Sequence, residues 1–273
     1  MDVWPVIVRV ALVLLALKLL VWWLEPRMAF FPLRGVQETP SAAGVPYRDL
    51  RIETSDGERL HAWWLERDDA RADVLFFHGN GGNLSLWLDI LVELWRRGFN
   101  VLAVDYRGYG DSTGRASEQG LYRDAEAALR AFADQRRSRS IPAIYWGRSI
   151  GAPVAAHASA IRPPDALVLE TPMPNARAVL RSNPLLWGLS FFSSYEFPTT
   201  RLLESYRGPL LVVHGDADGI VPFDAGRRVF EQAPTTRKTL AVIGGAGHND
   251  LHLVHPPKYW ENVDRFVASL AAR

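Results

Sequence analysis

Short apolar runs that alternate with helical segments constrain the fold of this chain more than any other feature. Each run has four to six residues, and most end in a loop rich in glycine or polar residues. The runs occupy residues 74–77, 100–104, 141–146, 166–169, 209–213 and 238–243. Apolar strands separated by helices predict a mostly parallel sheet covered by helices on both faces. In such sheets ligands bind where the carboxyl ends of the strands emerge, which is where these loops lie.

The remaining segments complete a predicted α/β domain over residues 47–273. Residues 47–54 and 58–65 alternate in polarity and are joined by Ser55-Asp56-Gly57, which predicts an antiparallel hairpin. Residues 173–208 interrupt the strand series and are rich in aromatic side chains, so we expect short helices that form a lid. The predicted helices cover residues 84–97, 117–137, 152–161, 223–232 and 259–272.

The N-terminal segment is almost continuously apolar from Val3 to Leu24, and Arg9 and Lys18 are its only charges. Its length corresponds to roughly 33 Å of helix, enough to cross a bilayer core. Residues 1–25 are therefore predicted to be a single-pass membrane anchor, and the proline-rich residues 26–46 a linker. A cleaved signal peptide and an in-plane amphipathic helix are the alternatives. Flanking arginines do not decide which side of the membrane the domain faces.

The overall composition excludes several kinds of function. The 273 residues carry a net charge of +1, which gives no support to nucleic-acid binding. Cysteine is absent, so disulfides, a cysteine nucleophile and thiolate metal sites are excluded. Oligomeric state is left open.

The pattern Gly147-Arg148-Ser149-Ile150-Gly151 lies between a predicted strand and a predicted helix. Strand, G-x-S-x-G and helix form a nucleophile elbow, in which a sharp turn exposes the serine hydroxyl. Only glycine at the flanking positions lets neighbouring backbone segments approach closely. Ser149 is therefore the candidate nucleophile.

A serine nucleophile requires a base and an acid. His248 lies in a glycine-rich loop after the last strand, and two aspartates, Asp216 and Asp218, follow the preceding strand. Spacing alone does not separate the two aspartates, one of which we expect to cap a turn. The order serine, acid, histidine matches the α/β hydrolases.

Alternative interpretations of the other motifs are weaker. The loop HGNGGN lacks the Lys-Ser/Thr ending of a phosphate-binding P-loop. His248, His252 and His255 have spacing suggestive of a metal site, but Asn249 stands where the zinc-protease pattern needs glutamate. Structural roles are expected for Arg107, which would tie loops together, and for Glu170.

Five loop motifs resemble those of α/β-hydrolase-domain proteins: HGNGGN, DYRGYGDSTG, GRSIG, HGDADGIVP and GGAGHND. The chain is most similar to the membrane-anchored serine hydrolases that include protein depalmitoylases, lysophospholipid lipases and bacterial relatives. The resemblance covers residues 47–272 and includes the N-terminal anchor. It implies an α/β-hydrolase fold and a serine hydrolase.

The same resemblance assigns site residues. It implies that Asp218 is the acid, and that the backbone N–H groups of Ile150 and Asn80 form the oxyanion hole. The expected substrate is an acyl ester or thioester at a membrane, contacted by lid residues Trp187, Phe191, Phe192 and Tyr195. No cofactor is expected. The alternatives are a serine peptidase of the prolyl-oligopeptidase type and a non-catalytic binding module on this fold.

Overall fold

The central sheet of the computed structural model has eight strands in the order β10-β9-β8-β7-β4-β6-β3-β2. The structure describes residues 3–136 and 140–270. The strands are β2 Tyr47–Glu53, β3 Arg59–Leu65, β4 Ala72–Phe77, β6 Phe99–Val104, β7 Ala143–Arg148, β8 Ala166–Glu170, β9 Leu210–Gly215 and β10 Lys238–Ile243. Strand β3 runs antiparallel to both its neighbours and every other pair is parallel. The mostly parallel sheet and the hairpin are confirmed.

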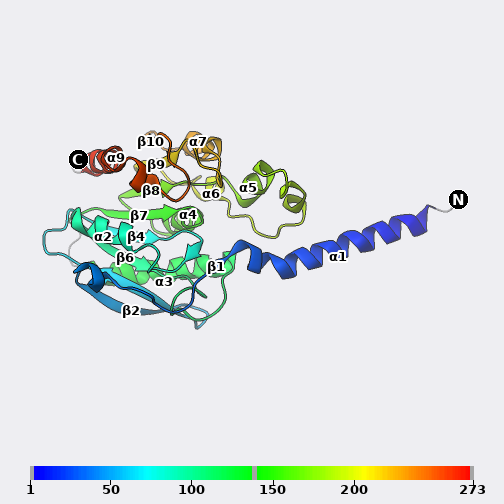
Figure 1. The fold of residues 1–273 in the computed structure, drawn as a ribbon, viewed down its shortest axis with the longest axis horizontal. Coiled ribbons are helices and arrows are strands. Elements are labelled where there is room, and N and C mark those ends of the chain that lie inside the picture. The colour runs from blue at the N-terminus through cyan, green and yellow to red at the C-terminus, as the bar shows by residue number, and fades with distance from the viewer. Residues whose placement is uncertain (1–2, 137–139, 271–273) are drawn as a thin grey trace.

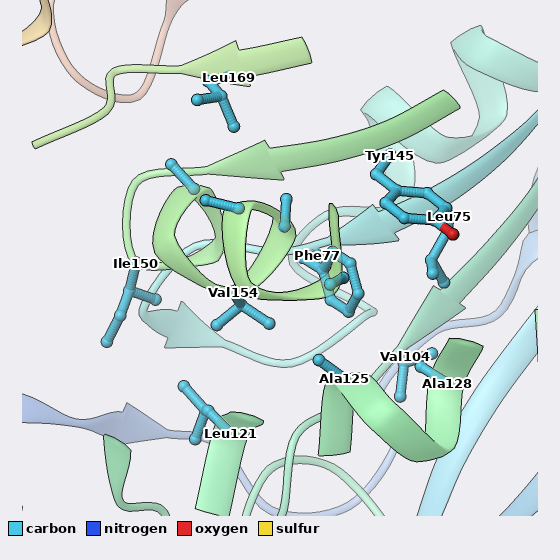
Figure 2. Close-up of a cluster of buried hydrophobic side chains, with 14 of the residues drawn as sticks. Leu75, Phe77, Val104, Leu121, Ala125, Ala128, Tyr145, Ile150, Val154 and Leu169 are labelled. Atoms are coloured by element: carbon cyan, nitrogen blue, oxygen red, sulfur yellow. The ribbon is translucent and has the colours of Figure 1, made fainter. Parts of the chain in front are cut away.

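Helices cover both faces of this sheet (Figure 1). One face carries α3 Glu118–Gln135, α4 Gly151–Ile161 and α7 Phe223–Gln232, and the other carries α2 Leu88–Arg96 and α9 Pro256–Ala268. Successive residues of β4 serve opposite faces, since Leu75 packs in the first core and Val74 in the second. Figure 2 shows the first core, where Val154 of α4 and Leu121 of α3 point into the space between their helices.

Helix boundaries differ from prediction where side chains or prolines replace backbone hydrogen bonds. Helix α2 begins at Leu88 instead of residue 84, because the Asn83 side chain accepts from the Ser85 N–H and holds a turn there. Helix α9 begins at Pro256 instead of residue 259, since proline is well tolerated in a first turn. The predicted ends of two helices, at residues 137 and 272, lie outside the described residues.

The predicted anchor is a helix, α1 Trp4–Ala29, long and apolar enough to cross a membrane by length and composition. It projects from the domain as a single rod in Figure 1. The first residues of the expected linker at 26–46 belong to α1, which continues through Pro26 to Ala29. After it, β1 Phe31–Pro32 pairs with β5 Gly81–Gly82, and the 3₁₀ helix η1 Pro40–Ala43 follows. This segment is therefore bonded to the HGNGGN loop.

The predicted lid lies between β8 and β9. It contains α5 Ala176–Ser182, the 3₁₀ helix η2 Trp187–Phe191 and α6 Thr199–Leu202. A short helix, α8 Leu251–Val254, links the His248 loop to α9.

Candidate active site

Ser149 occupies the sharp turn between β7 and α4. Its φ is 53°, a left-handed conformation that side-chain-bearing residues rarely adopt. The flanking glycines are required sterically, since a Cβ on Gly147 would lie 2.2 Å from the Gly151 carbonyl oxygen. A Cβ on Gly151 would lie 2.1 Å from the Phe77 carbonyl oxygen. Close backbone approach thus presses the turn against the end of β4 and holds Ser149 in its strained conformation.

The residues predicted as nucleophile, base and acid lie in one hydrogen-bonded row. The Ser149 Oγ is 2.9 Å from Nε2 of His248, and Nδ1 of His248 is 2.8 Å from Oδ2 of Asp218. Asp218 and His248 are buried, whereas Ser149 is half-buried. With its proton on Nδ1, the imidazole donates to Asp218 and accepts from the Ser149 hydroxyl.

Asp218 is ionised in this setting. Burial by itself would raise the pKa of Asp218, but hydrogen bonds from His214 and His248 outweigh it and hold that pKa well below its usual range. Its second oxygen, Oδ1, accepts from the backbone N–H groups of Ile220 and Val221, both at 2.8 Å. These bonds fix the carboxylate in one orientation toward the imidazole.

Asp216, the other candidate acid, faces a different loop. Its Oδ1 accepts from the Gly245 N–H at 2.6 Å, so it joins the loop after β9 to the loop after β10. Gly215 brings the same two loops together, because a Cβ there would lie 2.1 Å from the Ala246 carbonyl oxygen. The Ala217 N–H also donates to that oxygen at 3.1 Å. The relative position of Asp218 and His248 is therefore set by direct backbone contact.

The amides predicted for the oxyanion hole lie on two segments that touch. Gly151, next to Ile150, packs on the Phe77 and His78 carbonyl groups, where the HGNGGN loop begins. Within the described part of the chain, neither the Ile150 N–H nor the Asn80 N–H donates to another residue. Figure 2 shows the Ile150 side chain directed into the core.

Two tyrosines of the DYRGYG loop hold the loop that carries Asn80. The Tyr106 hydroxyl donates to the His78 carbonyl oxygen and the Tyr109 hydroxyl to that of Asn80, both at 3.0 Å. The Asn80 side chain donates to the Ala29 carbonyl oxygen at 2.6 Å, which ties the loop to the end of α1. The backbone around the Asn80 N–H is thus fixed from both sides.

Arg148, a position that the sequence analysis did not single out, lies buried behind the elbow. Its guanidinium donates to the His248 carbonyl oxygen at 3.2 Å and lies 3.7 Å from the Glu170 carboxylate. Glu170 also accepts from Trp146 and Tyr259. The signal for this pair was available in the sequence, because Arg148 and Glu170 are charged residues that end two apolar strands.

The other candidate residues have local partners. Arg107 binds the carboxylates of Asp56 and Asp124, as expected for a residue that ties loops together. The imidazole of His252, a candidate in the metal alternative, pairs with Asp89 at 2.8 Å.

The predicted lid aromatics divide into two groups. Trp187 and Phe191 contact each other edge to face with ring centroids 4.9 Å apart, and both are exposed. Tyr195 packs against Phe30 just after α1, with centroids 5.4 Å apart, and Phe192 is half-buried.

Comparisons with known proteins agree with this fold. A family profile described as serine aminopeptidase, S33, matches residues 68–202 and 187–252. An uncharacterized protein of Mycobacterium tuberculosis is 33% identical over 269 residues, 98% of this chain and 95% of the relative. A relative in Saccharomyces cerevisiae, described as an uncharacterized membrane protein, is 29% identical over 240 residues, 86% of this chain and 84% of that protein.

Solved structures show the same architecture. An esterase of Pyrococcus furiosus superposes with a TM-score of 0.74 at 21% identity, over 88% of this chain and 97% of the esterase. An alpha-beta hydrolase of Vibrio vulnificus gives 0.69 at 20% identity, over 82% of each chain. The expected α/β-hydrolase fold is confirmed. The chain belongs to the S33 family of the α/β-hydrolase superfamily and is a hydrolase with an esterase-like fold.

Proposed function

We propose that the protein is a membrane-anchored serine hydrolase that cleaves an acyl ester or thioester through an acyl-enzyme. Residues 1–25 serve as the anchor and residues 47–273 as the catalytic domain, with residues 173–208 as its lid. The observation that carries the proposal is the continuous hydrogen-bonded row from Ser149 Oγ through His248 to Asp218. Such a row, on a strained elbow, is the arrangement that activates a serine hydroxyl.

In the proposed reaction His248 acts first as a general base and then as a general acid. Nε2 takes the proton of Ser149 as Oγ attacks the acyl carbonyl carbon, and then delivers it to the departing alcohol or thiol. A water molecule attacks the acyl-enzyme with the same assistance and releases the acid. Asp218 stays ionised throughout, holds the tautomer with the proton on Nδ1, and stabilises the imidazolium.

The oxyanion is held by the backbone N–H groups of Ile150 and Asn80. Both are free of other acceptors within the described residues and lie on segments in mutual contact. Preorganised donors of this kind contribute about 10²–10³-fold to the rate.

The proposed location at a membrane is supported by two features. Helix α1 is exposed along its apolar length and has the hydropathy of a membrane span. The yeast relative is described as a membrane protein. We therefore place the hydrolase domain at a bilayer surface, with α1 in the bilayer.

The nucleophile is tested by replacing Ser149 with alanine in the full-length protein. We expect Ser149→Ala to lose all labelling by a fluorophosphonate probe, while Ser159→Ala, a serine buried in α4, keeps it after its fold is verified. Labelling that persists in Ser149→Ala would refute the assignment of the nucleophile.

The description of the S33 family makes a peptidase the second candidate. Parallel assays of p-nitrophenyl esters of increasing chain length and of aminoacyl p-nitroanilides separate the two. Ester turnover with a long-chain optimum supports the proposal, and anilide turnover alone supports an aminopeptidase. A folded protein that hydrolyses neither class would favour a binding module.

A further inference from the structure

Among the described residues of α1, Glu25 alone is buried, with 8% of its surface exposed. It lies one turn from the end of a helix whose apolar side chains are mostly exposed. A carboxylate is costly to bury unless it is hydrogen-bonded or paired with a charge. The partners of Glu25 therefore show what this end of α1 is built to contact.

The described hydrogen-bond partners of Glu25 all belong to lid residues 193–195, which follow the 3₁₀ helix η2. Its carboxylate accepts from the hydroxyl groups of Ser193 and Ser194 and from the Ser194 N–H at 2.8 Å. The Tyr195 N–H lies 3.5 Å away. Among the described residues no cation pairs with Glu25, so hydrogen bonds from the lid alone satisfy it.

A second carboxylate binds the next two residues of the lid. Glu118, the first residue of α3, accepts from the N–H groups of Glu196 and Phe197, both at 2.7 Å. Consecutive amides of residues 194–197 are therefore divided between Glu25 of α1 and Glu118 of the domain. The Phe30 ring adds edge contacts to Tyr195 and Phe197. Glu25 of α1 and Glu118 of α3 thus each face two of the four amides of this lid segment.

The outer part of the lid is apolar and unusually exposed. Leu185 is 92% exposed, and Trp187 and Phe191 are 53% and 58% exposed. Helix α5 buries no residue. Trp187 and Phe191 contact each other, and exposed apolar surface of this kind marks an interaction site. We call Leu185, Trp187 and Phe191 the lid tip.

The surroundings of the lid tip favour a lipid surface as its partner. Figure 1 shows α5 projecting from the domain on the same side as α1. Residues 176–191 contain two arginines and no acidic residue, a charge balance that favours anionic headgroups. Trp22 and Trp23 lie just before Glu25, and tryptophan pairs of this kind mark the level of a membrane interface.

We propose that Glu25 holds the lid against α1 so that the lid tip inserts into the bilayer that α1 crosses. The inference rests on the proposed anchor. Helix α1 is then a structural part of the lid as well as a tether, and the lid tip is a second membrane contact.

The absence of cysteine allows single introduced cysteines to carry an environment-sensitive fluorophore. We would label Leu185→Cys, Leu14→Cys in α1 and Arg265→Cys in α9, which Figure 1 shows at the end of the molecule remote from α1. Full-length protein is reconstituted in phosphatidylcholine vesicles with a minor fraction of phosphatidylglycerol. Quenching by lipids with brominated acyl chains reports insertion.

The expected result is quenching at Leu185→Cys and Leu14→Cys but not at Arg265→Cys. Quenching at Leu14→Cys without quenching at Leu185→Cys would overturn the lid inference and leave the anchor intact. No quenching at Leu14→Cys would refute the anchor itself. A blue shift at Leu185→Cys that persists in detergent and grows with protein concentration would indicate a second copy of the chain on the lid tip and overturn the inference.

The role of Glu25 is tested in the labelled Leu185→Cys background. We expect Glu25→Ala to lose quenching at the lid tip, whereas quenching at Leu14→Cys is retained. Glu38→Ala removes an exposed carboxylate from the next segment and serves as the matched control. Circular dichroism and thermal unfolding verify that each variant is folded. Undiminished lid-tip quenching in folded Glu25→Ala would show that Glu25 does not position the lid.

Discussion

Gly215, the last residue of β9, is the position where one added methyl group tests the geometry of the candidate triad most directly. A Cβ at Gly215 would lie 2.1 Å from the carbonyl oxygen of Ala246 and 3.0 Å from that of Gly247. Both opposing atoms are backbone, so no side-chain rotation relieves the contact. In Gly215→Ala the loop that carries His248 has to retreat from the loop that carries Asp218.

The size of this movement follows from the contact. The Ala246 oxygen must move by about 1 Å to reach the shortest separation that Cβ atoms make, and a misplacement of that size costs about 10²-fold in rate. Overpacking of this kind destabilises a fold by about 1–3 kcal/mol, less than a typical domain's stability of about 5–15 kcal/mol. We therefore expect a folded protein with a lower melting temperature and kcat reduced about 100-fold.

The assay is hydrolysis of a p-nitrophenyl ester, with thermal unfolding of the same sample. Gly219→Ala is the matched control, because a Cβ there meets no atom within 4 Å although Gly219 follows Asp218 directly. We expect the control to retain its rate and stability. A folded Gly215→Ala protein with the rate of the unchanged protein would refute the inference that this backbone contact sets the distance between acid and base.

Two further predictions concern Asp218 and Arg148. Replacing Asp218 with asparagine is expected to lower kcat by about 10⁴-fold, as a misaligned imidazole does in other triads. The pKa of Asp218 is held below its usual range, so its carboxylate stays ionised over the acid limb of the activity profile. The stability that this carboxylate contributes is lost only as pH falls below about 4 toward that lowered pKa. Above that pH the kcat/KM profile should therefore show no protonation step from Asp218, and a slope of two there would contradict this. Arg148→Met leaves Glu170 buried without its cation and should cost about 3–5 kcal/mol in denaturant unfolding, whereas Arg148→Met/Glu170→Gln should recover part of that loss.

Much of the fold was predictable because its signals are local. The bounds of α7 and β10 agree with prediction at both ends. Ser117 precedes α3 and its hydroxyl accepts from the Gly120 N–H, which fixes the start of that helix. Five of the short apolar runs become strands that are buried on both faces of the sheet, whereas β10 at the sheet edge is only partly buried. Where a boundary was wrong, as at the start of α2, the Asn83 side chain supplied a hydrogen bond that periodicity does not reveal.

The candidate residues were accessible from the sequence for a related reason. Ser149, Asp218 and His248 each follow the carboxyl end of a parallel strand, so a prediction of strand order suffices to bring them to one edge. Their alignment was not accessible, because it depends on distances between loops far apart in the chain. Gly215 illustrates this, since only the approach of Ala246 distinguishes it from the other glycines of these loops.

The contact between α1 and the lid also depends on residues far apart in the chain, which local sequence signals do not reveal. Residues 26–46 looked like a linker because proline content was the only local signal, and nothing in it revealed pairing with Gly81 and Gly82. Glu25 looked like the polar end of a membrane helix, although its hydrogen-bond partners lie about 170 residues along the chain. A buried carboxylate requires hydrogen-bond donors, and the sequence near Ser193 contains them. Only the fold brings the Glu25 carboxylate and these donors together. For this reason the anchor and the lid, which the sequence separates into distinct segments, are better treated as one unit that borders the candidate active site.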